Sequence, residues 1–315
     1  MIEQPHVVVL AGGEGSRLQS LTRALYGCDL PKQFAVLAGE RSLMQATIER
    51  ALQLTTPDRV SVVVTSHHEP IAREQLVPYP GIELVVQPHN LDTGPGLLLP
   101  LVRILTTSAA RHVVFLPSDH YIPNSAPLLD ALRGSDGDEI SLVGVAPTGP
   151  EVEYGWIVPG TRLDDGRDVF RVARFHEKPE ADIAESLYGR GGLWNTFILA
   201  GPTLAFWELA RRHLPNHAAA LETYAVAIGS FSEAVALQAA YRVMPKANFS
   251  RDLLAVADVL SVIAVEGSGW SDWGSPARVF ASLQGTPAHE QLVARIREPV
   301  AASNRTDADD ARMVA

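Results

Sequence analysis

Short apolar runs rich in β-branched residues recur through the first half of the chain, and segments with helical spacing of their apolar positions separate them. Alternation of this kind is typical of α/β proteins, in which helices cover both faces of a mostly parallel sheet. The pattern therefore predicts an α/β fold. The strands it predicts cover residues 6–10, 60–65, 82–87, 112–116 and 140–146.

Two of the expected helices have recognisable starts. Ser42, with Gln45 three positions later, fits a capping box for a helix that ends before Pro57. A second helix is expected to start near Thr93, because the proline two positions on suits a first turn. Pro100 is expected to kink or shorten that helix, since proline removes a backbone donor.

The second half of the chain has a different pattern, which we interpret as a substrate-binding lobe. The polar stretch 298–315 is expected to be a flexible tail without chemistry. The elements predicted in the second half are strands at 154–159, 169–176, 194–199 and 260–266 and helices at 202–214 and 249–259.

Composition narrows the classes of partner. The chain has 315 residues, 46% of them hydrophobic, and a formal net charge of −10, which argues against a broad nucleic-acid or membrane-surface footprint. Arg103 interrupts the richest apolar run, and the N-terminal residues lack a basic stretch followed by an apolar one. The single cysteine, Cys28, excludes an internal disulfide. We therefore expect a cytoplasmic protein with small-molecule partners.

A glycine-rich segment follows the first predicted strand and leads to Arg17. Glycines there allow backbone N–H groups to approach an anion closely. The segment lacks the third glycine of the dinucleotide fingerprint and the Gly-Lys-Ser/Thr of a P-loop. With Lys32 further on, two cations could bind a polyphosphate, although a tight turn with solvated charges explains the same residues.

Two aspartates, Asp119 and Asp272, each follow an apolar strand, where ligands of open α/β sheets bind. Carboxylate oxygens suit Mg²⁺, which usually takes one or two of them together with phosphate oxygens and water. Each aspartate alone could equally be an Asx-turn or a helix cap. We expect His120 to be a structural neighbour and the pair His67–His68 to lie in a solvated loop.

Polar residues in the second half suit a phosphorylated polar molecule. Glu177 could accept hydrogen bonds from hydroxyl groups, and the adjacent Lys178 could bind a phosphate. Asn195 could add an amide. A surface ion pair and a buried turn are the alternatives for these residues.

Taken in order, these segments resemble the sugar-phosphate nucleotidylyltransferases, and within them the mannose-1-phosphate guanylyltransferase branch. The resemblance covers about residues 7–275 and implies one nucleotidylyltransferase domain over residues 1–297, with a nucleotide-binding half of about residues 1–147 and a sugar-phosphate-binding half of about residues 148–297. The implied fold is that of the nucleotide-diphospho-sugar transferases, a Rossmann-like α/β/α sandwich around a mixed, mostly parallel central sheet. The segments that carry the resemblance are Leu10-Ala11-Gly12-Gly13-Glu14-Gly15-Ser16-Arg17-Leu18, Pro31-Lys32-Gln33-Phe34, Pro117-Ser118-Asp119-His120, Tyr154-Gly155, Phe175-His176-Glu177-Lys178-Pro179, Trp194-Asn195 and Trp270-Ser271-Asp272-Trp273-Gly274.

The resemblance also implies an activity: Mg²⁺-dependent transfer of a nucleotidyl group from an NTP, expected to be GTP, to a sugar 1-phosphate, expected to be mannose 1-phosphate, with release of pyrophosphate. A homodimer is a further expectation from the family. Asp119 and Asp272 would hold the metal. The residues implied as catalytic are Arg17, Lys32, Asp119 and Asp272; those at the nucleotide are Leu10, Ala11, Gly12, Gly13, Gly15, Ser16, Arg17, Lys32, Gln87, Thr93 and Gly94; those at the sugar phosphate are Gly155, Glu177, Lys178 and Asn195.

Some positions depart from the family pattern. Leu91-Asp92-Thr93-Gly94-Pro95-Gly96 stands where mannose enzymes have Arg-Asn-Thr-Ala-Pro-Ala, and Thr196-Phe197 replaces Ser-Gly. A uridylyl-, thymidylyl- or adenylyltransferase acting on glucose 1-phosphate therefore remains an alternative. A non-catalytic sugar-nucleotide sensor is a second alternative, and an NAD-dependent dehydrogenase is a distant third.

Overall fold

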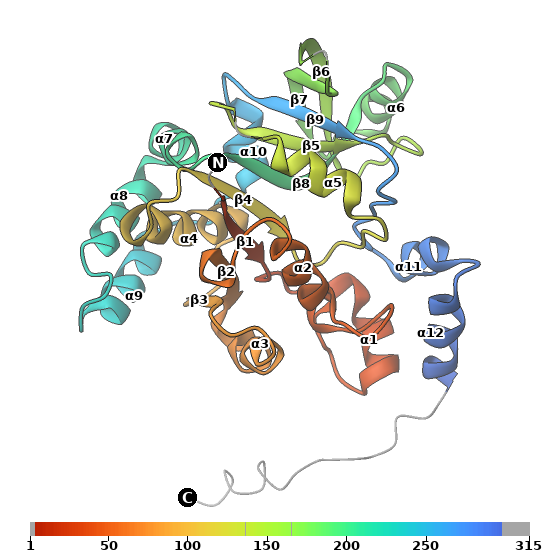
Figure 1. Cartoon of the computed structure of the whole chain (residues 1–315), viewed down its shortest axis with the longest axis horizontal. Coiled ribbons are helices and arrows are strands. Elements are labelled where there is room, and N and C mark those ends of the chain that lie inside the picture. Colours follow the sequence, from red (N-terminus) through yellow and green to blue (C-terminus); the bar gives the residue numbers. More distant parts are fainter. Residues whose placement is uncertain (1–3, 136, 165, 298–315) are drawn as a thin grey trace, which may run out of the picture.

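The structure, a computed structural model, describes residues 4–135, 137–164 and 166–297. Its centre is a nine-stranded sheet with the spatial order β3-β2-β1-β4-β8-β5-β9-β7-β6 (Figure 1). The strands are β1 (His6–Leu10), β2 (Val60–Thr65), β3 (Glu83–Gln87), β4 (His112–Pro117), β5 (Ser141–Val145), β6 (Gly155–Asp164), β7 (Val169–Glu177), β8 (Leu193–Pro202) and β9 (Ser261–Val265).

Strand directions make the sheet mixed but mostly parallel. β1 pairs in parallel with β2 and β4, and β2 with β3. β8 runs antiparallel between β4 and β5, and β7 runs antiparallel to β9 and β6. The other described strands point the same way as β1. The predicted mixed, mostly parallel sheet is confirmed, and strands from both halves of the chain share it.

Alternate residues of the central strands face two separate cores. Val8 and Phe115 lie in the core covered by α4, α7, α8, α9 and α10. Val7 and Leu116 lie in the core covered by α2, α3 and α5. This period of two is what a strand buried on both faces requires. The α/β/α sandwich is therefore confirmed, with α4, α7, α8 and α9 on the left in Figure 1.

The helices have the following bounds: α1 (Gln19–Tyr26), α2 (Leu43–Ala51), α3 (Glu69–Leu76), α4 (Thr93–Thr107), α5 (Ala126–Arg133), α6 (Ala181–Gly189), α7 (Thr203–His213), α8 (Pro215–Ala225), α9 (Glu233–Val243), α10 (Phe249–Asp252), α11 (Pro276–Leu283) and α12 (Pro287–Arg297). Within the described part of the chain, no helix combines the length and the hydropathy that crossing a bilayer requires. The expected tail at 298–315 lies outside the described residues.

Local sequence signals predicted the start of one helix correctly and the extent of two others less well. The Ser42 hydroxyl accepts from Gln45 N, and the Gln45 side chain accepts from Ser42 N, so the predicted capping box of α2 is confirmed. The sequence predicts that Pro100 kinks or shortens its helix. α4 is not shortened there and continues to Thr107, because burial of most of its length outweighs the lost backbone bond. The helix predicted at 249–259 is wrong in extent. It divides into α10 and the short η5 (Leu254–Val256), whose apolar residues are buried by tertiary packing.

His6 makes the stability of the fold depend on pH. Its ring is buried, with Nε2 2.8 Å from Ser61 Oγ, and burial lowers its pKa from 6.5 to about 4. The unfolded chain therefore binds a proton between these pH values that the folded chain does not, so stability is full above pH 6.5 and is lost as the pH falls. We expect this residue to lower the free energy of unfolding by about 2 kcal/mol between pH 7 and pH 5.

Urea unfolding at the two pH values measures this effect. The variant His6→Gln should show a correspondingly smaller pH dependence than the wild type, and His289→Gln serves as a control on α12. An unchanged pH dependence in His6→Gln would contradict the assignment.

Candidate active site

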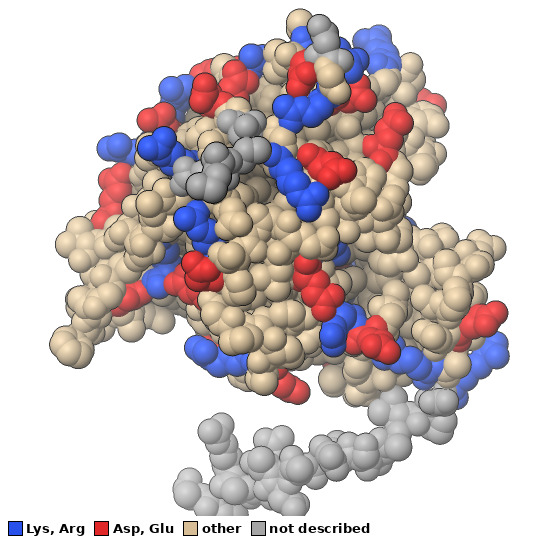
Figure 2. Space-filling view, viewed as in Figure 1, with Lys and Arg blue, Asp and Glu red and all other residues tan. Residues whose placement is uncertain are grey.

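A cavity of about 820 Å³ lies beside the carboxyl ends of β1 and β4. The face of the molecule in Figure 2 carries basic and acidic side chains interspersed, with neither sign forming a continuous patch. Most residues predicted for the site from the sequence line the cavity. They are Leu10, Gly12, Gly13, Gly15, Ser16, Arg17, Lys32, Gln87, Thr93, Asp119, Gly155, Glu177, Lys178, Asn195 and Asp272.

The glycine-rich loop after β1 forms one wall, and Gly15 is required there by backbone conformation and by space. A Cβ at Gly12 would lie 2.9 Å from Nε2 of Gln87, the end of a side chain that can shift. Gly15 has a φ of +62°, and a Cβ there would lie 2.7 Å from the backbone nitrogen of Lys32. A Cβ at Gly13 would meet no atom within 4 Å, so at this position the backbone faces open space. Gly13 therefore leaves room for a ligand.

Two predicted residues, Ala11 and Gly94, lie behind the wall instead of lining the cavity. Ala11 is buried, and its N–H donates to Val63 O at 2.8 Å. Gly94 donates to Ala247 O at 2.8 Å, and a Cβ there would lie 2.8 Å from that oxygen. Both positions therefore support packing of the wall, which explains why small residues occupy them.

Lys32 joins the two segments that carry the predicted metal-binding aspartates. Its side chain is 11% exposed, and Nζ lies 3.1 Å from Asp119 Oδ2 and donates to the backbone oxygen of Asp272 at 2.7 Å. A β-bridge between Tyr121 and Ser271 pairs the same two segments. One ammonium group therefore contacts both loops, although they are far apart in the sequence.

Asp119 is held ionised by its neighbours. Burial alone would raise its pKa, but Lys32 and His120 outweigh burial and hold the pKa below its usual value. His120 is buried and accepts a hydrogen bond at Nδ1 from Trp270 Nε1 at 3.2 Å, consistent with the structural role expected from the sequence. Asp119 is therefore a carboxylate at neutral pH, the form that a hard cation binds.

The carboxylate of Asp272 is fixed by three donors. Its Oδ1 accepts from Tyr154 Oη at 2.6 Å, from Gly274 N at 2.9 Å and from an Arg278 amine at 3.2 Å. Burial, followed by the bond to Asp272, raises the pKa of Tyr154, so the phenol stays a donor. Arg278 also forms an ion pair with Glu151, so its guanidinium compensates the negative charge of both Asp272 and Glu151.

Arg17 lines the cavity and forms an ion pair with another lining residue, Glu153. Its guanidinium lies 3.0 Å from Glu153 Oε2, and both side chains are about half exposed. An exposed ion pair of this kind contributes at most about 1 kcal/mol. Arg17 can therefore exchange Glu153 for an anionic ligand at little cost.

The remaining predicted residues lie together at the ends of β6, β7 and β8. A Cβ at Gly155 would lie 3.1 Å from Glu177 Oε2 and 3.3 Å from Asn195 Cβ, so only glycine fits there without a shift. Asn195 Oδ1 accepts a hydrogen bond from Phe197 N at 3.1 Å, and its Nδ2 is the atom that can donate to a ligand. Burial, opposed by Lys178, raises the pKa of Glu177 above its usual value. The predicted sugar-phosphate residues thus share one end of the cavity.

Backbone strain is concentrated here. Among the described residues, the non-glycine positions with positive φ are Asp92 (71°), Lys178 (46°), Phe197 (57°) and Trp273 (45°). The first three line the cavity, and Trp273 lies between two residues that do. Such conformations cost about 1–3 kcal/mol each and are usually maintained at functional sites.

Several residues at the site were missed in the sequence. One is Arg278, on α11, which contacts Asp272. Its position only six residues after Asp272 is the sequence signal that could have revealed it. Asn90 and Asp92 were also missed, although they lie in the loop between the end of β3 and the start of α4, next to the predicted Gln87 and Thr93. Lys246, Asn248 and Ser250 reach the cavity through tertiary contacts, such as the backbone bond from Ala247 N to Leu91 O.

Residues 6–284 match the family model described as nucleotidyl transferase, and the chain therefore belongs to the nucleotidyl transferase family. It is 33% identical over 200 residues to the mannose-1-phosphate guanylyltransferase of Salmonella montevideo, covering 60% of this chain and 41% of the relative. It is 28% identical over 293 residues to the mannose-1-phosphate guanylyltransferase ManC of Salmonella typhimurium, covering 89% and 60%. The chain thus spans about half the length of these curated relatives.

Solved structures confirm the fold. A Thermus thermophilus structure described as mannose-1-phosphate geranyltransferase is 30% identical, with a TM-score of 0.77 over 90% of this chain and 81% of that one. The inositol-1-phosphate CTP transferase of T. maritima has a TM-score of 0.57 at 15% identity, which shows likeness of fold alone. The expected nucleotide-diphospho-sugar transferase fold is confirmed.

Proposed function

We propose that this protein transfers the guanylyl group of GTP to mannose 1-phosphate, forming GDP-mannose and pyrophosphate with Mg²⁺. The observation that carries the proposal is the contact of one buried ammonium, Lys32, with both aspartate segments at the glycine-lined cavity. The similarity to mannose-1-phosphate guanylyltransferases supports the choice of substrates.

The chemistry requires no general base. A phosphate monoester has a second pKa of about 6, so the nucleophile is already largely dianionic at neutral pH. The main barrier is the electrostatic repulsion between the sugar phosphate and the triphosphate. The protein lowers this barrier by positioning the two substrates and by neutralising their charge. Mg²⁺, when bound, would supply further neutralisation of the phosphate oxygens.

Each part of the cavity has a role in this proposal. The glycine-rich loop binds the triphosphate, while Arg17 and Lys32 stabilise the charge that develops on the leaving pyrophosphate. Lys178 holds the phosphate of the incoming sugar, and Glu177 and Asn195 bind its hydroxyl groups.

We propose Asp119 and Asp272 as the ligands of Mg²⁺, because both line the cavity and offer the hard oxygen ligands that this ion prefers. Arg278 pairs with Asp272 and balances its charge in the described arrangement. We propose that ligand binding redirects this guanidinium towards phosphate, since metal and guanidinium would both compensate the same carboxylate.

The proposal is tested by measuring pyrophosphate release with each of ATP, GTP, CTP, UTP and dTTP, in combination with mannose 1-phosphate or glucose 1-phosphate. GTP with mannose 1-phosphate should give the highest kcat/KM. A preference for UTP, dTTP or ATP with glucose 1-phosphate would assign the alternative transferase. Binding of a nucleoside-diphosphate sugar without turnover in Mg²⁺ would favour a sensor.

The proposal extends to compartment and assembly. The proposed substrates of the enzyme are highly charged metabolites, so we place the enzyme in the cytoplasm. We also propose that it forms a homodimer. Sedimentation of the purified protein measures the latter directly.

A further inference from the structure

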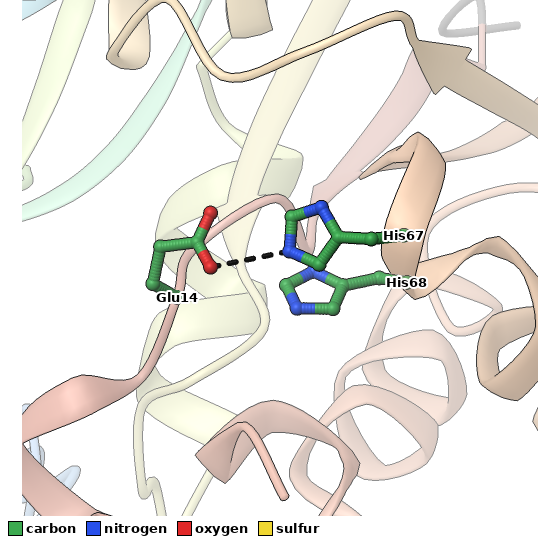
Figure 3. A group of neighbouring side chains, drawn as sticks. All are labelled: Glu14, His67 and His68. Carbon is green, nitrogen blue, oxygen red and sulfur yellow. Dashed lines mark hydrogen bonds and ion pairs between the residues drawn. The ribbon is translucent and has the colours of Figure 1, made fainter. Parts of the chain in front are cut away.

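A second group of side chains of the types that bind metals lies apart from Asp119 and Asp272, next to the cavity, which one of its members, Glu14, lines. It consists of Glu14, His67 and His68, and one ligand atom from each lies within 4.8 Å of the other two. Figure 3 shows the Glu14 carboxylate, from the glycine-rich loop, facing the two imidazole rings of η4 (Ser66–His68).

The expectation of a solvated histidine pair is correct for His67 and wrong for His68. The His67 side chain is 53% exposed, whereas His68 is only 5% exposed. The two rings pack with their centroids 3.9 Å apart. His68 is buried because Phe34 packs edge-on against it, at 5.4 Å between ring centroids.

The donor set is that of a transition metal. Zinc binds imidazole nitrogen and carboxylate oxygen at about 2.0–2.2 Å, which places neighbouring ligands of a tetrahedral site about 3.4 Å apart. Glu14 Oε2 and His67 Nε2 lie 3.1 Å apart, close to that spacing. Mg²⁺ prefers an octahedron of oxygens, so two imidazoles distinguish this group from the aspartate pair.

Outer contacts orient two of the three ligands. Thr65 Oγ1 lies 3.1 Å from His68 Nδ1 and fixes that ring. Asn90 Nδ2 donates to Glu14 Oε1 at 3.3 Å, leaving Oε2 on the side of His67. Ligating side chains in metalloproteins are usually supported in this way.

An ion pair accounts for the contact of Glu14 with His67, and packing on Phe34 accounts for the burial of His68. Neither contact requires ligand atoms of all three side chains to converge, and this convergence is the observation that carries the proposal.

We propose that Glu14, His67 and His68 form a site for a divalent transition metal of the zinc and cobalt class, with three protein ligands and one open position. Because Glu14 belongs to the glycine-rich loop and the histidines follow β2, a bound ion would fasten that loop to the end of the neighbouring strand.

Cobalt titration of the metal-stripped full chain tests this proposal. Mg²⁺ is kept in excess to occupy the aspartates, and the visible d–d absorption of tetrahedral Co²⁺ is recorded. We expect one Co²⁺ per chain, displaced by Zn²⁺. His67→Ala and Glu14→Gln should each weaken binding by at least about tenfold, since even the loss of an outer contact often costs that much. His289→Ala is the matched control.

Thermal melting without added metal checks that each variant folds, and Glu14→Gln keeps the size of the side chain it replaces. Absence of saturable Co²⁺ absorption in the wild type, or undiminished affinity in both variants, would overturn the site. The readout does not use turnover, so it is independent of the pyrophosphate-release panel. A failure of the proposed function would leave this result unaffected, and the reverse also holds.

Discussion

Replacing Asp272 with asparagine is expected to lower kcat by at least about 100-fold, because several kcal/mol of charge stabilisation depend on this carboxylate. The fold should survive. Asparagine keeps an oxygen that can accept from Tyr154 Oη and Gly274 N, the two contacts that hold the turn. Steady-state pyrophosphate release at saturating substrates and Mg²⁺ measures the effect.

Asp258→Asn is the matched control. Asp258 is 72% exposed and pairs with Arg212 at the surface, so the same chemical change there should leave kcat unaltered. Wild-type turnover in Asp272→Asn would remove the proposed metal role of this residue. Loss of the thermal unfolding transition in Asp272→Asn would indicate that the charge of Asp272 is needed for folding. The metal role would then be tested with Asp119→Asn, the same change at the other proposed ligand.

Replacing Lys32 with methionine should be comparably severe, a loss of at least about 100-fold in kcat, the scale seen when a single charge-stabilising donor is removed. Methionine fills similar space but ends the contacts with Asp119 and with the backbone oxygen of Asp272. Both aspartate segments lose their shared partner at once. Turnover and KM for each substrate are the quantities to measure.

The same variant should shift the pH profile in a defined direction. Burial raises the pKa of Asp119, and Lys32 is the main group that opposes burial and keeps the pKa low. Without Lys32 the carboxyl takes up its proton at higher pH, so the acid limb of kcat/KM should move to higher pH. Arg212→Met, on the surface, is the control. An unmoved acid limb in Lys32→Met would show that Asp119 does not control it.

The strands of the first half were predictable because their sequence signal is local. β1 and β2 match the predicted ranges 6–10 and 60–65, since uninterrupted β-branched runs bounded by turn residues have few alternatives. Pro100 shows where local rules fail. The burial that keeps α4 intact comes from elements distant in sequence, so no window around the proline contains the information.

The same limit applies to the site. The predicted residues come from motifs whose glycines, lysine and aspartates lie next to predicted strand ends, where chemistry is concentrated in open sheets. Arg278 belongs to no such motif and reaches Asp272 because α11 starts just beyond the turn. His68 was misjudged because its burial depends on Phe34, which is remote in sequence.

The position of β8 has a consequence for engineering. This strand carries Asn195 and hydrogen-bonds to β4 on one side and β5 on the other. In a chimera joined near residue 147, β8 would come from one parent, and β4 and β5, the two strands that it pairs with, would come from the other. Exchange of sugar preference between relatives is better attempted by grafting side chains at the cavity than by swapping whole halves.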